Sequence, residues 1–122
     1  MDPRFITRNI HAYLDYPVAL SLMAAPFLLQ LGNSNPLAFW LAFGTGIAAF
    51  ALTLLTDHQL GVFRVLPYSF HLAVDGIVGV TFLAAPILLG FSGIDAWYYW
   101  ANGAAVVFVV ALHKPETEAS YA

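Results

Sequence analysis

Histidine and aspartate occur twice in the chain at the same spacing. His11-x-x-x-Asp15 is repeated as His71-x-x-x-Asp75. In an α-helix, residues four apart lie on one face, so each pair would present an imidazole and a carboxylate together. These groups ligate transition metals and also relay protons. The two pairs are therefore the candidate site, for a metal or for proton handling.

The other histidines extend this candidate site. His58 and His113 follow the second and fourth predicted helices, so all histidines are expected toward the same membrane surface. Ionisable groups at membrane depth are functional candidates by default. We therefore include His58 and His113 among the candidate cofactor or metal ligands.

Helix capping is the alternative interpretation of the same aspartates. Asp15 is followed closely by Pro17, and Asp75 is followed by Gly76. Asp is a favoured N-cap, and Pro is favoured in the first turn of a helix. Helices that begin there would keep roughly 17 residues, just enough to cross a bilayer. Capping at the membrane interface thus explains both pairs without a ligand.

The composition is that of a membrane protein. The 122 residues are 61% hydrophobic and only 9% charged, whereas a soluble domain has about 25% charged residues. The stretches between Asp15 and Asp57, Asp75 and Asp95, and Asp95 and Lys114 contain no charged residue. Each predicted span needs about 20 apolar residues. The sequence thus predicts an all-α protein with transmembrane helices at 13–31, 36–56, 70–91 and 95–113.

The chain is a tandem repeat. Shifted by 60 residues, Ala24-Ala25-Pro26 coincides with Ala84-Ala85-Pro86 and Trp40 with Trp100, as the His–Asp pairs also do. Scarce residue types do not coincide by composition alone, so the duplication is real. We predict one membrane domain, 1–122, with parallel two-helix repeats at about 11–56 and 70–114 joined by a cytoplasmic loop at 57–69.

The basic residues predict the orientation. Arg4, Arg8, Arg64 and Lys114 all lie on the side of the termini, and the short turns at 32–35 and 92–94 contain none. Basic residues are retained on the cytoplasmic side. We therefore expect both termini in the cytoplasm and a multi-pass protein of a bacterial inner membrane.

Two further sets of residues are predicted to shape the helix bundle. Pro26 and Pro86 fall in the middle of the predicted helices, where proline removes a backbone hydrogen bond and kinks the helix. Small and aromatic residues are expected at helix packing surfaces or interfaces with other proteins. These residues are Gly44, Gly46, Trp40 and Trp100.

Several function classes lack support. Four Lys and Arg residues, well separated, form no basic patch for nucleic acid. There is no Cys, which excludes thiolate metal sites and disulfides. No nucleophile accompanied by a base, phosphate-binding loop or zinc-enzyme motif occurs, so no catalytic residue is predicted. The expected partners are the lipid bilayer and other membrane protein subunits.

The layout resembles the SPW-repeat family of bacterial and archaeal membrane proteins. That family carries a Ser-Pro-Trp motif in the first of two helices per repeat, and the corresponding tripeptides here are Ala25-Pro26-Phe27 and Ala85-Pro86-Ile87. The proline is kept, while the flanking Ser and Trp are replaced in both copies. The resemblance implies the repeat fold and brings no biochemical activity.

The sequence favours a non-catalytic integral membrane protein. We expect a structural or accessory subunit, or an interaction protein, of a larger membrane complex, with respiratory and photosynthetic complexes as candidates. Two alternatives stay open. One is a carrier of haem, a chlorophyll-type pigment or a metal ion on the cytoplasm-side histidines, although no cofactor is required. The other is a small transporter.

Overall fold

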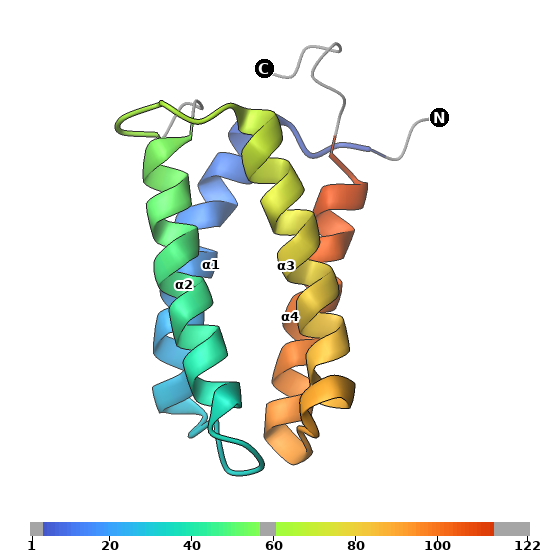
Figure 1. Cartoon of the computed structure of the whole chain (residues 1–122). Coiled ribbons are helices and arrows are strands. Elements are labelled where there is room, and N and C mark those ends of the chain that lie inside the picture. The colour runs from blue at the N-terminus through green and yellow to red at the C-terminus, as the bar shows by residue number, and fades with distance from the viewer. Residues whose placement is uncertain (1–3, 57–60, 114–122) are drawn as a thin grey trace.

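The protein is an all-helical bundle of two antiparallel hairpins (Figure 1). The computed structural model describes residues 4–56 and 61–113. Within these residues there are four helices and no β-strand: α1 (Arg8–Leu28), α2 (Leu37–Leu55), α3 (Tyr68–Leu89) and α4 (Gly93–Ala111). Helix α1 packs against α2, and α3 packs against α4. Each predicted repeat is thus one helical hairpin.

Two of the described helices, α2 and α3, are long and apolar enough to cross a membrane. Both ends of the described chain lie at one end of the bundle, because the Ile6 amide donates a hydrogen bond to the Leu112 carbonyl at 3.0 Å. We call this the terminal end, and the opposite end, with the hairpin turns, the turn end. The two ends of the described chain therefore lie side by side, and two of its helices have the length and composition of membrane spans.

The predicted capping role of the aspartates is wrong. Helix α1 begins at Arg8, and its N-cap is Thr7, whose Oγ1 accepts a hydrogen bond from the Ile10 amide at 3.1 Å. Asp15 consequently lies two turns inside the helix. Asp75 lies equally deep inside α3, which begins at Tyr68. The helix starts were misplaced because the pattern Asp15-x-Pro17 resembles a helix start, whereas α1 continues through it.

The predicted mid-helix position of the two repeated prolines is also wrong. Pro26 and Pro86 lie in the last turns of α1 and α3, since these helices end at Leu28 and Leu89. Their carbonyls accept hydrogen bonds from the Leu31 and Phe91 amides at 3.0 and 2.9 Å. Pro17 also lies inside α1, further from its end, and the repeat does not preserve it.

Glycines allow close contact within each hairpin. A Cβ on Gly46 would lie 2.7 Å from Met23 Cγ and 2.9 Å from the Met23 amide nitrogen. In the second hairpin, a Cβ on Gly103 would lie 2.9 Å from the Gly79 carbonyl. Gly44 differs, because nothing lies within 4 Å of its Cβ direction. Its predicted role in contact with another protein stays a prediction.

The two tryptophans that the repeat aligns, Trp40 and Trp100, occupy different environments. Trp40 is 62% exposed and packs edge-on to Phe39. Trp100 donates its indole N–H to the Leu83 carbonyl at 3.2 Å and so contributes to the α3–α4 contact. Of these two, Trp40 presents more of its ring to the surroundings.

A buried carboxylate joins the hairpins at the turn end. Asp95, 1% exposed at the start of α4, accepts hydrogen bonds from the amides of Gly32 and Ser34 at 2.9 and 3.0 Å and from the Ser34 hydroxyl at 2.5 Å. The Tyr99 hydroxyl adds a bond to the Ala38 carbonyl at 2.6 Å. Because α2 and α3 touch little, the hairpins are held together mainly at their two ends.

Candidate functional site

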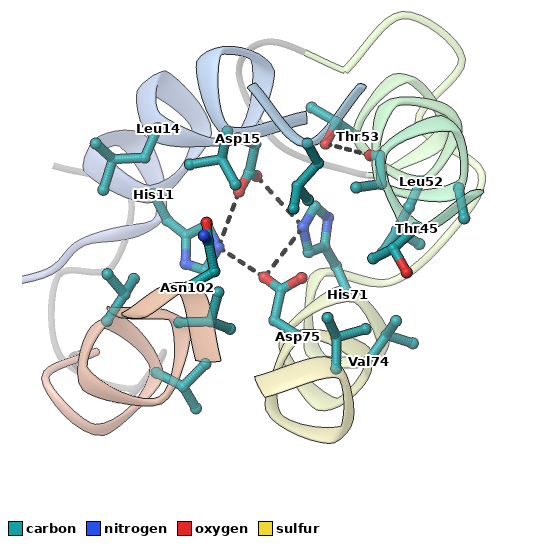
Figure 2. A pocket seen from close by; sticks show the side chains of 18 of the residues that line it. His11, Leu14, Asp15, Thr45, Leu52, Thr53, His71, Val74, Asp75 and Asn102 are labelled. Atoms are coloured by element: carbon teal, nitrogen blue, oxygen red, sulfur yellow. Dashed lines mark hydrogen bonds and ion pairs between the residues drawn. The ribbon is translucent and has the colours of Figure 1, made fainter. Parts of the chain in front are cut away.

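Four side chains from α1 and α3 converge near the terminal end of the bundle. They are His11, Asp15, His71 and Asp75, which we call the His–Asp centre (Figure 2). One potential ligand atom from each residue lies within 4.8 Å of the others. The i,i+4 spacing places each pair on one helix face, and the packing of the hairpins turns the two faces toward each other. The centre is thus built from both repeats.

The contacts within the centre cross between the repeats. His11 Nε2 lies 3.0 Å from Asp15 Oδ1 and 2.8 Å from Asp75 Oδ2. His71 Nε2 lies 3.3 Å from Asp15 Oδ2 and 3.3 Å from Asp75 Oδ2. Each imidazole therefore faces the carboxylate of its own helix and that of the other helix. The arrangement has the two-fold character of the repeat.

The centre is largely shielded from solvent. His11 and His71 are 3% and 2% exposed, and the side chains of Asp15 and Asp75 are 10% and 20% exposed. Burying a carboxylate costs several kcal/mol unless a positive charge and hydrogen bonds compensate it. The centre thus requires compensating positive charge close to its carboxylates.

A threonine fixes the orientation of the His71 ring. Thr56 Oγ1 donates its proton to the Leu52 carbonyl at 2.5 Å, which leaves the oxygen as the acceptor for His71 Nδ1 at 2.8 Å. This hydrogen-bond network assigns a proton to Nδ1. In a neutral ring, Nε2 then carries the lone pair. The lone pair would be directed at the carboxylates of Asp15 and Asp75.

Such a lone pair cannot face two carboxylates without a cation between them. Either His71 gains a second proton and donates from Nε2, or a metal ion occupies the space between the ligand atoms. A His that binds a metal through one nitrogen almost always donates the other N–H to a neighbouring group, and Thr56 is placed for that function. The geometry therefore fits a metal site with an oriented ligand.

Four of the separations between ligand atoms are 2.8–3.3 Å and all lie within 4.8 Å, so small shifts would bring the set around a small divalent ion. Tetrahedral Zn²⁺ has bonds of about 2.0–2.1 Å to imidazole nitrogen and carboxylate oxygen, which places neighbouring ligand atoms about 3.3 Å apart. His71 Nε2 stands 3.3 Å from an oxygen of each aspartate. His11 Nε2 is closer, at hydrogen-bond distance, and would move outward by a few tenths of an ångström to ligate.

The two remaining candidate histidines are His113 and His58. His113 is buried next to His11, with ring centroids 5.7 Å apart, but its Nε2 is 2.6 Å from the Tyr68 hydroxyl. It belongs to the aromatic wall around the centre and not to the ligand set of four. His58 lies outside the described residues.

A chamber lies between the hairpins beside the centre. Its volume is about 520 Å³, and all four helices contribute to its walls. The four residues of the His–Asp centre belong to its lining (Figure 2). Most of the wall is aliphatic, from side chains such as Leu22, Leu52, Val78 and Val106, while Thr45 and Asn102 add polar groups. The centre thus borders an apolar space.

Two residues important to this arrangement were not identified from the sequence. Thr56 gave no signal because its partner, His71, is 15 residues away across the inter-repeat loop. Asp95 entered the sequence analysis only as a charged residue between apolar segments. A carboxylate can also accept hydrogen bonds from the backbone amides of a turn, and this role was the signal that was missed. Both act by holding other groups in place.

Comparison with known families agrees with this architecture. The model of the SPW repeat domain matches residues 9–113. The chain belongs to the SPW repeat family. This confirms the resemblance carried by the repeated Pro26 and Pro86, and supports a small membrane protein with that repeat. No curated protein and no solved structure matches the chain. The matched segment contains all four residues of the His–Asp centre.

Proposed function

We propose that this SPW-repeat protein binds one divalent transition-metal ion, best matched by Zn²⁺, at the His–Asp centre. The observation that carries the proposal is the convergence within 4.8 Å of four ligand atoms from both repeats, two of them on buried histidines and two on partly buried aspartates. Two imidazoles and two carboxylates form a ligand set typical of such ions. The metal-carrier alternative is thus favoured over haem or a pigment.

The closed ligand set supports a structural ion. Catalytic zinc has three protein ligands and an open position, whereas structural zinc has four protein ligands. Here α1 and α3 would each supply two. The ion would therefore join the two hairpins at the terminal end, as Asp95 joins them at the turn end. Its charge would also compensate the two carboxylates.

The membrane placement that we propose has four spans and cytoplasmic termini in a bacterial inner membrane. It is supported by the apolar α2 and α3, by the adjacent ends of the described chain, and by the basic residues on that side. Because the chain has no Cys, single cysteines introduced at Asn33 and Phe63 report the side of each loop. Labelling of both positions from the same side would contradict the proposal.

An accessory role in a larger membrane complex remains our proposal for the exposed aromatic surface near the turn end. Phe27 and Trp40, 61% and 62% exposed, lie there beside Phe39 and Phe43. Lipid and a partner subunit would both cover such rings. Gentle extraction of the protein from its own membrane tests this role, because a partner subunit would co-purify in fixed stoichiometry.

The metal proposal is tested by the metal content of the full chain purified in mild detergent and loaded with zinc. We expect one tightly held ion per chain. The variants His71→Gln and Asp15→Asn should lose it. The matched variants His113→Gln and Asp95→Asn, which carry the same changes outside the centre, should retain it.

Helical circular dichroism and the elution volume in gel filtration check that each variant is folded. A wild-type chain that folds but retains no zinc would contradict the proposal. So would a retained ion that is unaffected by both changes in the centre.

A further inference from the structure

The chamber beside the His–Asp centre is elongated along the helices. Along α4 its wall extends from Asn102 to Val110, which corresponds to about 12 Å of helix at 1.5 Å per residue. One leaflet of the hydrocarbon core is about 15 Å deep. The chamber therefore extends across most of a leaflet, with its polar end at the His–Asp centre.

We propose that this chamber binds a neutral, single-chain, long-chain alcohol, with the chain between the hairpins and the hydroxyl on Asp75. The volume of about 520 Å³ lies within the range of small-molecule sites, about 300–1,000 Å³. The occupant is thus an alkyl or isoprenoid alcohol drawn from the membrane.

The walls require an apolar occupant. Leu14 and Val18 line the chamber, yet each is 39% exposed. Water in such a space would lack the polar partners that buried water needs. An empty space would leave the wall atoms without the dispersion contacts of a packed interior. A hydrocarbon chain provides those contacts.

The polar end selects the head group. Asp75 lines the chamber, and both imidazoles contact its Oδ2 (Figure 2). Its Oδ1 is turned away from the histidines (Figure 2) and would be the acceptor for the hydroxyl of the proposed ligand. With a divalent ion bound, two aspartates and the ion sum to zero charge, so this step rests on the proposed function. A carboxylate or ammonium head would bring an uncompensated charge into an apolar site.

The experiment uses dodecanol with a photoreactive diazirine at its methyl end, added to the purified, zinc-loaded full chain. Mass spectrometry should locate the label on chamber walls distant from the centre, such as Leu22 and Asn102. Dodecanol should compete, whereas dodecanoic acid and dodecylamine should compete far less. Equal competition by all three would overturn the assignment of the hydroxyl head.

A matched pair of variants tests the chamber itself. Val78→Phe fills it and should abolish labelling. Val80→Phe makes the same change two residues away on the same helix, at a position 62% exposed and outside the chamber, and should leave labelling unchanged. Val106→Phe fills the chamber from α4 and replaces Val78→Phe if that variant does not fold. Labelling that is equal in the filled and control variants would overturn the inference.

Zinc content measured on the same samples separates the two proposals. Labelling of the chamber without bound zinc would support the chain site and contradict the metal. Bound zinc without chamber labelling would contradict the chain site alone. Loss of labelling in Val78→Phe with its zinc retained would support both.

Discussion

Substitution of two glycines on α2 tests how tightly the first hairpin is packed. A Cβ on Gly46 would lie 2.7 Å from Met23 Cγ, 2.9 Å from the Met23 amide nitrogen and 3.0 Å from the Ala19 carbonyl oxygen. A Cβ on Gly44, two residues earlier, would have nothing within 4 Å. Substitution by alanine therefore creates a clash at Gly46 and no new contact at Gly44.

The difference in stability follows from two effects. Alanine is preferred over glycine inside a helix by about 0.8–1.0 kcal/mol, so Gly44→Ala should raise the free energy of unfolding by up to about 1 kcal/mol. At Gly46 this gain is opposed by overpacking, which costs about 1–3 kcal/mol. The upper end applies because backbone atoms of α1 cannot rotate away. We expect Gly46→Ala to be less stable than Gly44→Ala by about 2–3 kcal/mol.

The assay is reversible unfolding in mixed detergent micelles, followed by helical circular dichroism. Gly103→Ala gives an independent check in the second hairpin, because its Cβ would lie 2.9 Å from the Gly79 carbonyl oxygen. It should be destabilised as Gly46→Ala is. Equal stability of the Gly46→Ala and Gly44→Ala proteins would contradict the close packing of α1 on α2 at Gly46.

Two further substitutions address the ends of the bundle. Asp95→Asn replaces one acceptor oxygen by a donor facing the Gly32–Ser34 turn, so the free energy of unfolding should fall by about 1–3 kcal/mol; an unchanged unfolding midpoint would contradict the anchoring role of Asp95. Thr56→Val removes the acceptor for His71 Nδ1 and should weaken zinc binding by at least about tenfold. Competition with a chromophoric chelator measures the affinity, and an unaltered value would contradict the assigned ring orientation.

Much of the fold was predictable because it is periodic in sequence. The 60-residue offset predicted paired hairpins, and the charge-free stretches located the helices. The helix starts were not predictable from Asp15 and Pro17, since the same residues are compatible with a cap and with a helix interior. The hydrogen bond from the Ile10 amide to the Thr7 hydroxyl identifies Thr7 as the N-cap, and this bond is seen only in the structure.

The candidate site was predicted as two separate pairs and not as one centre. The i,i+4 spacing shows that His11 and Asp15 share a face, but sequence alone does not show which face meets the other repeat. That depends on contacts between the hairpins, such as those of Asp95 with the amides of Gly32 and Ser34. Contacts between distant segments, such as that of Thr56 with His71, have no local pattern at all.

The most direct test of the metal centre is X-ray absorption at the zinc edge of the loaded, purified protein. We expect four ligands at about 2.0–2.1 Å, of which two give the scattering pattern of imidazole rings. The imidazole contribution should fall by half in His71→Gln if any zinc is retained. A spectrum without imidazole scattering, or one of six oxygen ligands, would contradict the central claim that both repeats hold one ion through His11, Asp15, His71 and Asp75.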